Sequence, residues 1–204
     1  EKILSITECE IVIAENNSQV NKILSIKDKL PVVKKIIHFE NDIKDEVRAD
    51  ASSKNVELYY FQDLLVEGQK WRITNKNVVE EELQKGNSDD LATYIFTSGT
   101  TGTPKGVMLT HRNFLAQLDE IPERIYLNPG DKGIVVLPIW HSFEREVEYV
   151  VMCQAATICY SKPIGSILLA DLKKLNPHVL PAVPRSPSAS YKTLLALFHQ
   201  APLA

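Results

Sequence analysis

The sequence has no excess of positive charge and no long apolar run. Its 204 residues include 23 Lys and Arg against 26 Asp and Glu, giving a formal net charge of -3. No overall basic field exists to hold a polyphosphate backbone, so we expect no nucleic acid partner. The most apolar stretch, residues 147–160, is interrupted by Glu148 and Gln154 and is shorter than the roughly 20 residues of a membrane-spanning helix. We interpret it as buried core.

Cysteine is also scarce. Cys9, Cys153 and Cys159 are odd in number and have no paired CxxC spacing. This pattern argues against a disulfide framework or a cysteine zinc site and predicts a cytoplasmic location. The chain begins at Glu1 without Met, which indicates a piece of a longer protein, and it shows no signal peptide. With 44% hydrophobic and 24% charged residues, the composition is that of a globular protein with one full core.

Short apolar runs alternate with amphipathic stretches, and this alternation predicts an α/β fold of mixed sheets with flanking helices. The expected strands are residues 10–14, 34–39, 91–96, 106–109, 134–137, 157–160 and 178–183. One helix is expected after a cap at Asn17 or Ser18, with Val20, Ile23 and Leu24 on one face. Two more are expected at 61–69, on a face of Phe61, Leu64 and Leu65, and at 143–154. Residues 42–53 and 80–90 are expected to be polar surface connections.

The segment between Thr97 and Gly106, TSGTTGTPKG, has a composition suited to phosphate: three glycines, five hydroxyl side chains and one lysine. Glycines let the backbone approach a ligand with its amide N–H groups free, and hydroxyls add donors. The positive charge of Lys105 can follow the β- and γ-phosphates as pyrophosphate leaves. We therefore expect phosphate binding by Thr97, Ser98, Gly99, Thr100, Thr101, Gly102, Thr103, Lys105 and Gly106, with catalytic roles for Lys105 and Thr100.

Three other interpretations have to be compared with this one. A flexible polar turn between two strands is the usual outcome for a Gly/Thr-rich stretch. A Walker loop needs GK followed by Ser or Thr, but here Pro104 precedes Lys105 and Gly106 follows it. A dinucleotide-binding fingerprint is missing too, because GDKG at residues 130–133 lacks the GxGxxG spacing. A phosphate loop joining two adjacent strands agrees best with the residues.

The run YIFTSGTTGTPKG, Tyr94 to Gly106, resembles the signature of the adenylate-forming (AMP-binding) superfamily. That resemblance implies an enzyme that makes an acyl-AMP and pyrophosphate from ATP and, in many members, then transfers the acyl group to a thiol. Downstream, GVMLTHRNF, LPIWHSFER and DLKKLNPHVLPAVPR are similar to the long-chain fatty acid–CoA ligase branch. The implied substrates are ATP, a long-chain fatty acid and CoA, with Mg²⁺ as the accompanying metal, although no residue is assigned as a metal ligand.

Within LPIWHSFER, the resemblance places His141 and Trp140 at the acyl and adenylate pocket. His141 could equally be a histidine hydrogen-bonded at the start of a helix, because its ring can donate and accept. Trp140 and Phe143 could line an acyl tunnel or be plain core. Glu144 is expected to be a solvated carboxylate at a helix start.

The resemblance implies that residues 1–185 are the central part of the large N-terminal domain of such an enzyme. Residues 186–204 depart from the family pattern, as an altered tail would, and Tyr191, Leu194, Leu195 and Phe198 have amphipathic helical spacing. The family's later adenine, ribose and hinge motifs and its C-terminal lysine have no match here. A non-catalytic remnant and an enzyme for an aryl or amino acid are therefore alternatives. Peripheral membrane contact is compatible with acyl substrates, and the oligomeric state stays open.

Overall fold

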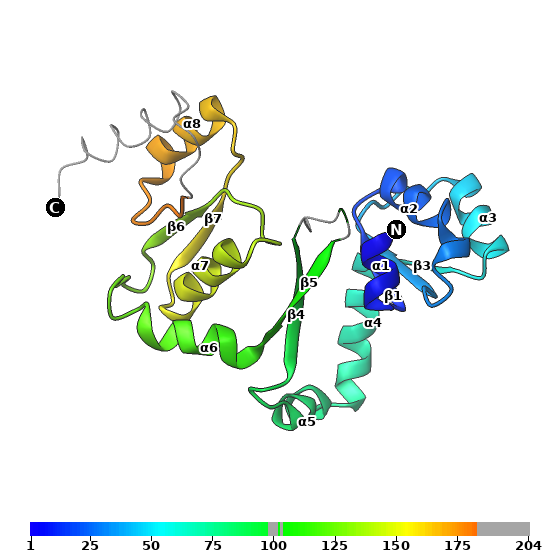
Figure 1. Cartoon of the computed structure of the whole chain (residues 1–204), viewed down its shortest axis with the longest axis horizontal. Helices are drawn as coiled ribbons and strands as arrows, with labels where there is room; N and C mark the ends of the chain where they lie inside the picture. Colours follow the sequence, from blue (N-terminus) through cyan, green and yellow to red (C-terminus); the bar gives the residue numbers. More distant parts are fainter. Residues whose placement is uncertain (98–101, 103, 183–204) are drawn as a thin grey trace. The chain divides into compact units, whose positions relative to one another are not determined.

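The computed structural model describes residues 1–97, 102 and 104–182 (Figure 1). By their contacts these residues belong to two compact units. The first contains residues 1–86 and 96–106, and the second contains residues 87–95 and those from Val107 onward. Helices and small sheets alternate in both units, so the expected α/β class with mixed sheets and flanking helices is confirmed.

A three-stranded parallel sheet forms the centre of the first unit. Its strands lie in the order β1 (Ile11–Ala14), β2 (Lys35–His38), β3 (Glu57–Tyr60). The register pairs Ile13 with Ile37, and Ile37 with Tyr59. The first two strands were predicted from their β-branched runs. The third was not, because its ELYY sequence has no β-branched residue.

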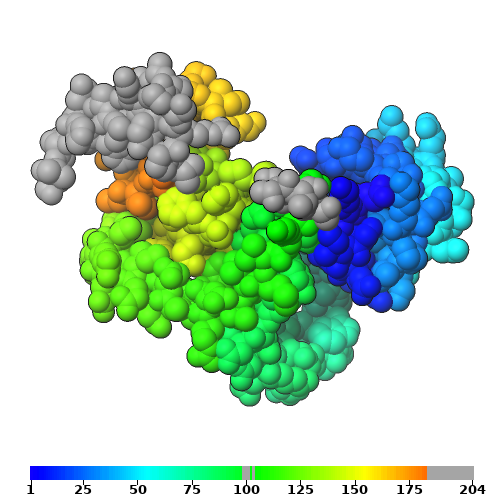
Figure 2. Space-filling model, in the orientation of Figure 1, coloured from blue at the N-terminus to red at the C-terminus, as the bar shows by residue number. Residues whose placement is uncertain are grey.

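Two helices, α2 (Asn17–Leu24) and α3 (Asp45–Ser53), cover one face of this sheet. The predicted inward face of α2 is confirmed, since Val20, Ile23 and Leu24 are all buried. The opposite face of the sheet carries Ile11 and Ile13, whose exposed fractions are 53% and 60%. The sheet therefore has one packed face, and on its other face the two isoleucines of β1 are open to solvent. Figure 2 shows the atoms of this part of the chain in blue to cyan.

Two predictions for this region are wrong. The N-cap of α2 is Asn16, whose side chain accepts from the Gln19 backbone N–H at 3.1 Å, and not Asn17 or Ser18. Asn17 is instead bound by the Glu40 carboxylate through its backbone N–H and its side-chain amide, both at 2.7 Å. Residues 42–53 are also not a surface connection, since most of them form α3. The prediction failed because α3 has only two inward side chains, Val47 and Ala51, and therefore a weak apolar pattern.

The remaining helices of the first unit bury little. They are α1 (Lys2–Thr7), a 3₁₀ turn at Lys27–Lys29, α4 (Phe61–Thr74) and α5 (Val78–Lys85). The helix predicted at 61–69 is confirmed and runs five residues further. None of its residues is fully buried, but Phe61 and Leu64 of the predicted face are half-buried, whereas Leu65 is exposed. The polar crossing predicted at 80–90 is wrong in its first half, where the acidic residues lie on α5.

The strands β4 (Leu91–Thr97) and β5 (Lys105–Thr110) are hydrogen-bonded neighbours in a two-stranded sheet. Both were predicted, as was their adjacency. The connection between them is too short for a parallel crossover, so the pair is a hairpin. The predicted phosphate loop is the connection at its tip.

In the second unit, β6 (Lys132–Val135) and β7 (Thr157–Tyr160) pair in parallel. The helix between them, α7 (Ser142–Cys153), packs against both strands and against α6 (His111–Glu120). At Gly133 the helix comes so close that an added Cβ would lie 2.8 Å from Val151 Cγ2. The last helix described is α8 (Gly165–Leu175). Of these, β6, α7 and β7 were predicted, while α6 and α8 were not.

The strand predicted at 178–183 is reduced, within the described residues, to a single parallel bridge between Val179 and Gly133. Pro181 lacks the N–H that would extend the ladder. The helix predicted on Tyr191, Leu194, Leu195 and Phe198 lies outside the described residues, and the domain division at residue 185 stays a prediction.

Candidate functional site

The predicted phosphate loop begins and ends on exposed residues of the hairpin. Thr97 is the last residue of β4, Lys105 is the first residue of β5, and Gly106 follows it; all three are exposed. A lysine at the start of a strand has its backbone fixed by the ladder while its long side chain stays mobile in solvent. Lys105 can therefore follow a ligand held at the tip of the hairpin.

Between the two strands the structure describes Gly102 and Pro104. The φ of Gly102 is +75°, and nothing lies within 4 Å of where a Cβ would be. Glycine is favoured here by the backbone conformation and not by crowding. The Gly102 carbonyl accepts a hydrogen bond from Lys2 Nζ at 3.2 Å. Ser98, Gly99, Thr100, Thr101 and Thr103 lie outside the described residues, so their phosphate contacts and the catalytic role of Thr100 stay predictions.

The segment before α7 carries the two residues predicted for the acyl pocket. His141 is the N-cap of α7, and its Nδ1 accepts from the Phe143 backbone N–H at 3.4 Å. Its own backbone N–H donates to Pro138 O at 2.9 Å. Trp140, beside it, has an exposed fraction of 72%. The alternative of a hydrogen-bonded histidine at a helix start is thus observed, and substrate contact by His141 and Trp140 stays a prediction.

Glu144, expected as a solvated carboxylate, is instead completely buried. Burial and the nearby charge of Glu148 raise its pKa to about 7 from the ordinary value of 4.5. The backbone amides of Val136 and Leu137 lie close enough to oppose this rise. Neither completes a hydrogen bond, since both carboxyl oxygens are without a partner among the described residues. The expectation was wrong because the carboxyl lies near the backbone of Val136 and Leu137 and not in solvent.

Glu148 is buried one turn later on α7, with 6% of its surface exposed. Burial raises its pKa, while the Arg145 charge and the Tyr160 hydroxyl oppose the rise. Glu146, on another face of the helix, also has its pKa raised by burial. The sequence held a signal for this: positions 144, 148 and 151 follow the 4 and 3 spacing of a buried helix stripe that ends in Val151.

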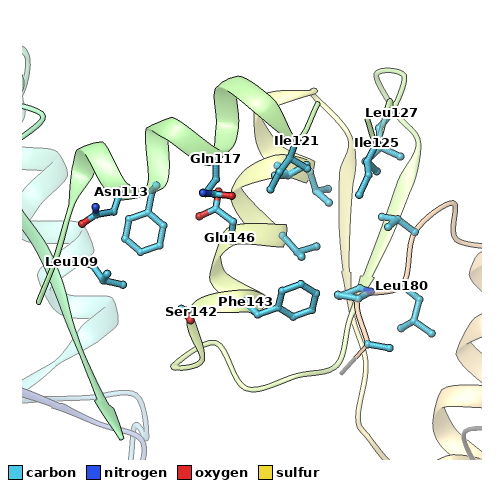
Figure 3. A pocket seen from close by; sticks show the side chains of 17 residues that line it. Leu109, Asn113, Gln117, Ile121, Ile125, Leu127, Ser142, Phe143, Glu146 and Leu180 are labelled. Atoms are coloured by element: carbon cyan, nitrogen blue, oxygen red, sulfur yellow. The ribbon is translucent and has the colours of Figure 1, made fainter. Parts of the chain in front are cut away.

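A cavity of about 680 Å³ lies within the second unit. Figure 3 shows Phe143 turned into the space between α6, α7 and the segment around Leu180. The lining is mainly aliphatic and aromatic, with a few polar side chains from Asn113, Gln117, Ser142 and Glu146. The volume and the sparse polar groups are those of a site for an apolar small molecule. His141 and Trp140 are not among its lining residues.

The described residues contain no group of three or more His, Cys, Asp or Glu side chains placed to hold a metal ion. The described side chains therefore form no dedicated cluster of Mg²⁺ ligands. None of the helices in the described part is both long and apolar enough to cross a bilayer.

Comparison with known proteins adds to this geometry. The model of the AMP-binding enzyme family matches residues 1–190. A long-chain-fatty-acid–[acyl-carrier-protein] ligase of Arabidopsis thaliana, AEE15, is 35% identical over 132 residues, which are 63% of this chain and 18% of that protein. Long-chain-fatty-acid–CoA ligase 1 of Homo sapiens is 44% identical over 101 residues, which are 48% of this chain and 14% of that protein. The chain thus spans less than a fifth of these two relatives.

Solved structures share the fold at low identity. VinN has a TM-score of 0.56 and 17% identity, over 94% of this chain and 45% of that one. The o-succinylbenzoate CoA synthetase MenE of Bacillus subtilis, in complex with the acyl-adenylate intermediate OSB-AMP, has a TM-score of 0.51 and 16% identity, over 93% and 45%. At these identities the likeness supports the fold alone.

Proposed function

Since the chain belongs to the AMP-binding enzyme family, we propose that it supplies the phosphate-binding part of an ATP-dependent ligase for long-chain fatty acids. In the first step a fatty acid carboxylate oxygen attacks the α-phosphorus of ATP, giving acyl-AMP and pyrophosphate. In the second, the sulfur of CoA replaces AMP on the acyl carbon, giving the thioester. Supporting the class of substrate, both relatives described above are named as long-chain fatty acid ligases.

The single observation that carries the proposal is the hairpin. The two ends of the signature lie on the paired strands β4 and β5, with Lys105 exposed at one end of the connection and Gly102 in a conformation that suits glycine. Backbone amides and hydroxyls of residues 97–103 would hold the phosphates. The Lys105 ammonium would meet the charge that develops on pyrophosphate, which is where binding contributes to rate.

Magnesium bound with ATP would neutralise phosphate charge, and the chain's own residues would orient the nucleotide. The apolar cavity beside α7 offers room for a hydrocarbon chain, and we assign His141 and Trp140 to the same end of α7 as the reacting carboxyl. We further propose a cytoplasmic enzyme whose contact with membranes is peripheral, because its acyl substrates partition into bilayers.

ATP binding by the 204-residue chain, measured by calorimetry, tests the hairpin assignment. We expect Lys105→Ala to weaken binding by about tenfold, in line with the loss of one charge-assisted contact. Lys76→Ala, which removes another exposed lysine, should leave binding unchanged. Equal affinity of the Lys105→Ala and parent chains, or no binding by the parent, would overturn the assignment.

The acyl class needs a second experiment. Exchange of labelled pyrophosphate into ATP should depend on palmitate and not on benzoate or aspartate, in the longest form of the protein that carries this segment. Exchange that depends on benzoate or aspartate would replace the fatty acid with another carboxylic acid. Exchange with none of the three would favour a non-catalytic nucleotide binder.

A further inference from the structure

Glu144 occupies an unusual position for a buried acid. It is in the first turn of α7, where side chains commonly reach solvent, yet none of its surface is exposed and both its carboxyl oxygens lack a hydrogen-bond partner among the described residues. Buried carboxyls without partners are costly. A residue retained at such a cost needs an explanation in terms of what it contacts.

Helix capping does not provide that explanation. A Glu three positions after the N-cap commonly reaches back to accept from the N-cap backbone N–H. Here that N–H, on His141, donates to Pro138 O instead, and the capping side chain is the His141 imidazole. The Glu144 carboxyl is therefore left free to face the backbone amides of Val136 and Leu137, which follow the end of β6.

This arrangement places the carboxyl against Val136 and Leu137, at the start of the segment that runs from the end of β6 to the start of α7. The segment is anchored at one end by β6 and at the other by the His141 cap, and it carries the exposed Trp140. We propose that Glu144 is a positioning residue. Its carboxyl holds segment 136–141 in place from the side of Val136 and Leu137, and so determines the positions of Trp140 and His141. Its consequence for acyl transfer rests on the proposed function, whereas the positioning itself does not.

The charges around Glu144 make this position sensitive to pH. On α7 itself Glu148 disfavours the carboxylate, and Glu148 is in turn acted on by Arg145 and by Tyr160 from β7. From α6, Asn113 and Gln117 line the cavity beside α7 and are uncharged. With the pKa of Glu144 raised to about 7, the carboxyl is neutral in mildly acidic solution and ionises near neutrality. Ionisation beside the segment should change its conformation.

Trp140 provides a local probe. The chain has two tryptophans, so Trp71→Phe leaves Trp140 as the single one. In that background we expect the Trp140 emission maximum to shift with pH, with a midpoint near 7. Glu144→Gln should abolish the shift. Glu146→Gln, a matched change on another face of the same helix, should keep it, as should His141→Asn, which removes the imidazole beside Trp140.

No ATP or fatty acid is needed, so this test is independent of the proposed function. A shift that persists in Glu144→Gln, that vanishes in His141→Asn, or that is missing in the parent would overturn the proposal. If Glu144→Gln does not fold, Glu144→Asp replaces it: the shorter side chain draws the carboxyl away from Val136 and Leu137, and the midpoint should then move. An unchanged midpoint in Glu144→Asp would also overturn it.

Discussion

Arg112 and Asp89 form a two-point ion pair, with Arg112 Nε 2.6 Å from Asp89 Oδ1 and Arg112 Nη2 2.8 Å from Asp89 Oδ2. Two backbone hydrogen bonds accompany it, from Arg112 N to Ser88 O at 2.7 Å and from His111 N to Asp90 O at 3.1 Å. Asp89 precedes β4 and Arg112 follows β5, so these contacts close the end of the hairpin that is opposite the connection. The paired guanidinium lowers the pKa of Asp89.

We expect Arg112→Gln to speed hydrogen exchange with solvent at the backbone amides of residues 111 and 112. The change should be less than about tenfold, because exposed ion pairs contribute little. Since the folded-state pKa of Asp89 lies below its ordinary value of 3.8, the contribution is present above that value and is lost as pH falls through the folded pKa. The parent and Arg112→Gln should thus become alike in acid. Arg124→Gln, which removes an exposed arginine elsewhere, is the control.

Glu144→Gln should stabilise the second unit at pH 8. Because the folded-state pKa is raised from 4.5 to about 7, the folded chain binds more protons between those values, and its stability falls as pH rises through that window. Gln carries no charge, so the variant should lose this slope and gain roughly 2–3 kcal/mol at pH 8. Urea unfolding followed by Trp140 emission in Trp71→Phe measures it. Glu123→Gln changes an exposed glutamate, so it should neither remove the pH dependence nor raise the stability at pH 8. If Glu144→Gln raised the stability at pH 4 as much as at pH 8, the raised pKa of Glu144 would not be the cause.

Gly133→Ala should destabilise the second unit by about 1–3 kcal/mol, the usual cost of an overpacked core. The added Cβ would lie 2.8 Å from Val151 Cγ2 and 3.2 Å from Val179 Cγ1. Val151→Ala removes the nearer methyl, so the double variant should be more stable than the sum of the single changes predicts. Urea unfolding of the four chains gives this coupling, and strict additivity would contradict it.

Gly68→Ala is the matched control for a glycine change. Gly68 lies within α4, and nothing is within 4 Å of an added Cβ. Alanine should raise the stability of the first unit by up to about 1 kcal/mol, because it is the better helix former. A loss of stability would show that the surroundings of Gly68 are more crowded than described.

Filling the cavity should weaken the binding of a long fatty acid. Val147→Trp adds bulk to a half-buried lining position of α7. We expect palmitate to bind more weakly, by up to about tenfold, since each buried methylene contributes roughly 0.8 kcal/mol. Met152→Trp makes the same addition on an exposed face of α7 and should have no effect. Equal binding by Val147→Trp and the parent would place the acyl chain elsewhere.

The strands that the sequence predicted are those with an unbroken β-branched or aromatic run, such as β1, β2 and β4. Their pattern is local, so it indicates a strand without information on what the strand packs against. Among the helices that it missed, α3 and α5 have few or no inward residues, so their sequences do not differ from those of polar loops. For α3, the packing of Val47 and Ala51 supplies what its own periodicity lacks.

The candidate site shows the same division. The hairpin and its exposed Lys105 could be predicted because a glycine-rich connection between two strands is a local feature. The burial of Glu144 could not, because it depends on how Val136 and Leu137, which follow β6, lie against the first turn of α7. A glutamate after a helix cap is commonly solvated, and only the spacing from Glu144 to Glu148 and Val151 hinted otherwise.

The one-sided packing of the β1–β3 sheet has a calorimetric consequence. Parallel sheets are normally covered on both faces, whereas Ile11 and Ile13 are more than half exposed here. Heat capacity rises on unfolding because apolar surface becomes hydrated, by about 12–15 cal/mol/K per residue in ordinary domains. Side chains that are already hydrated in the folded state add little to that rise. The first unit should therefore have a flatter stability curve than a domain of its size with both faces covered, and its stability should change less with temperature on either side of the maximum.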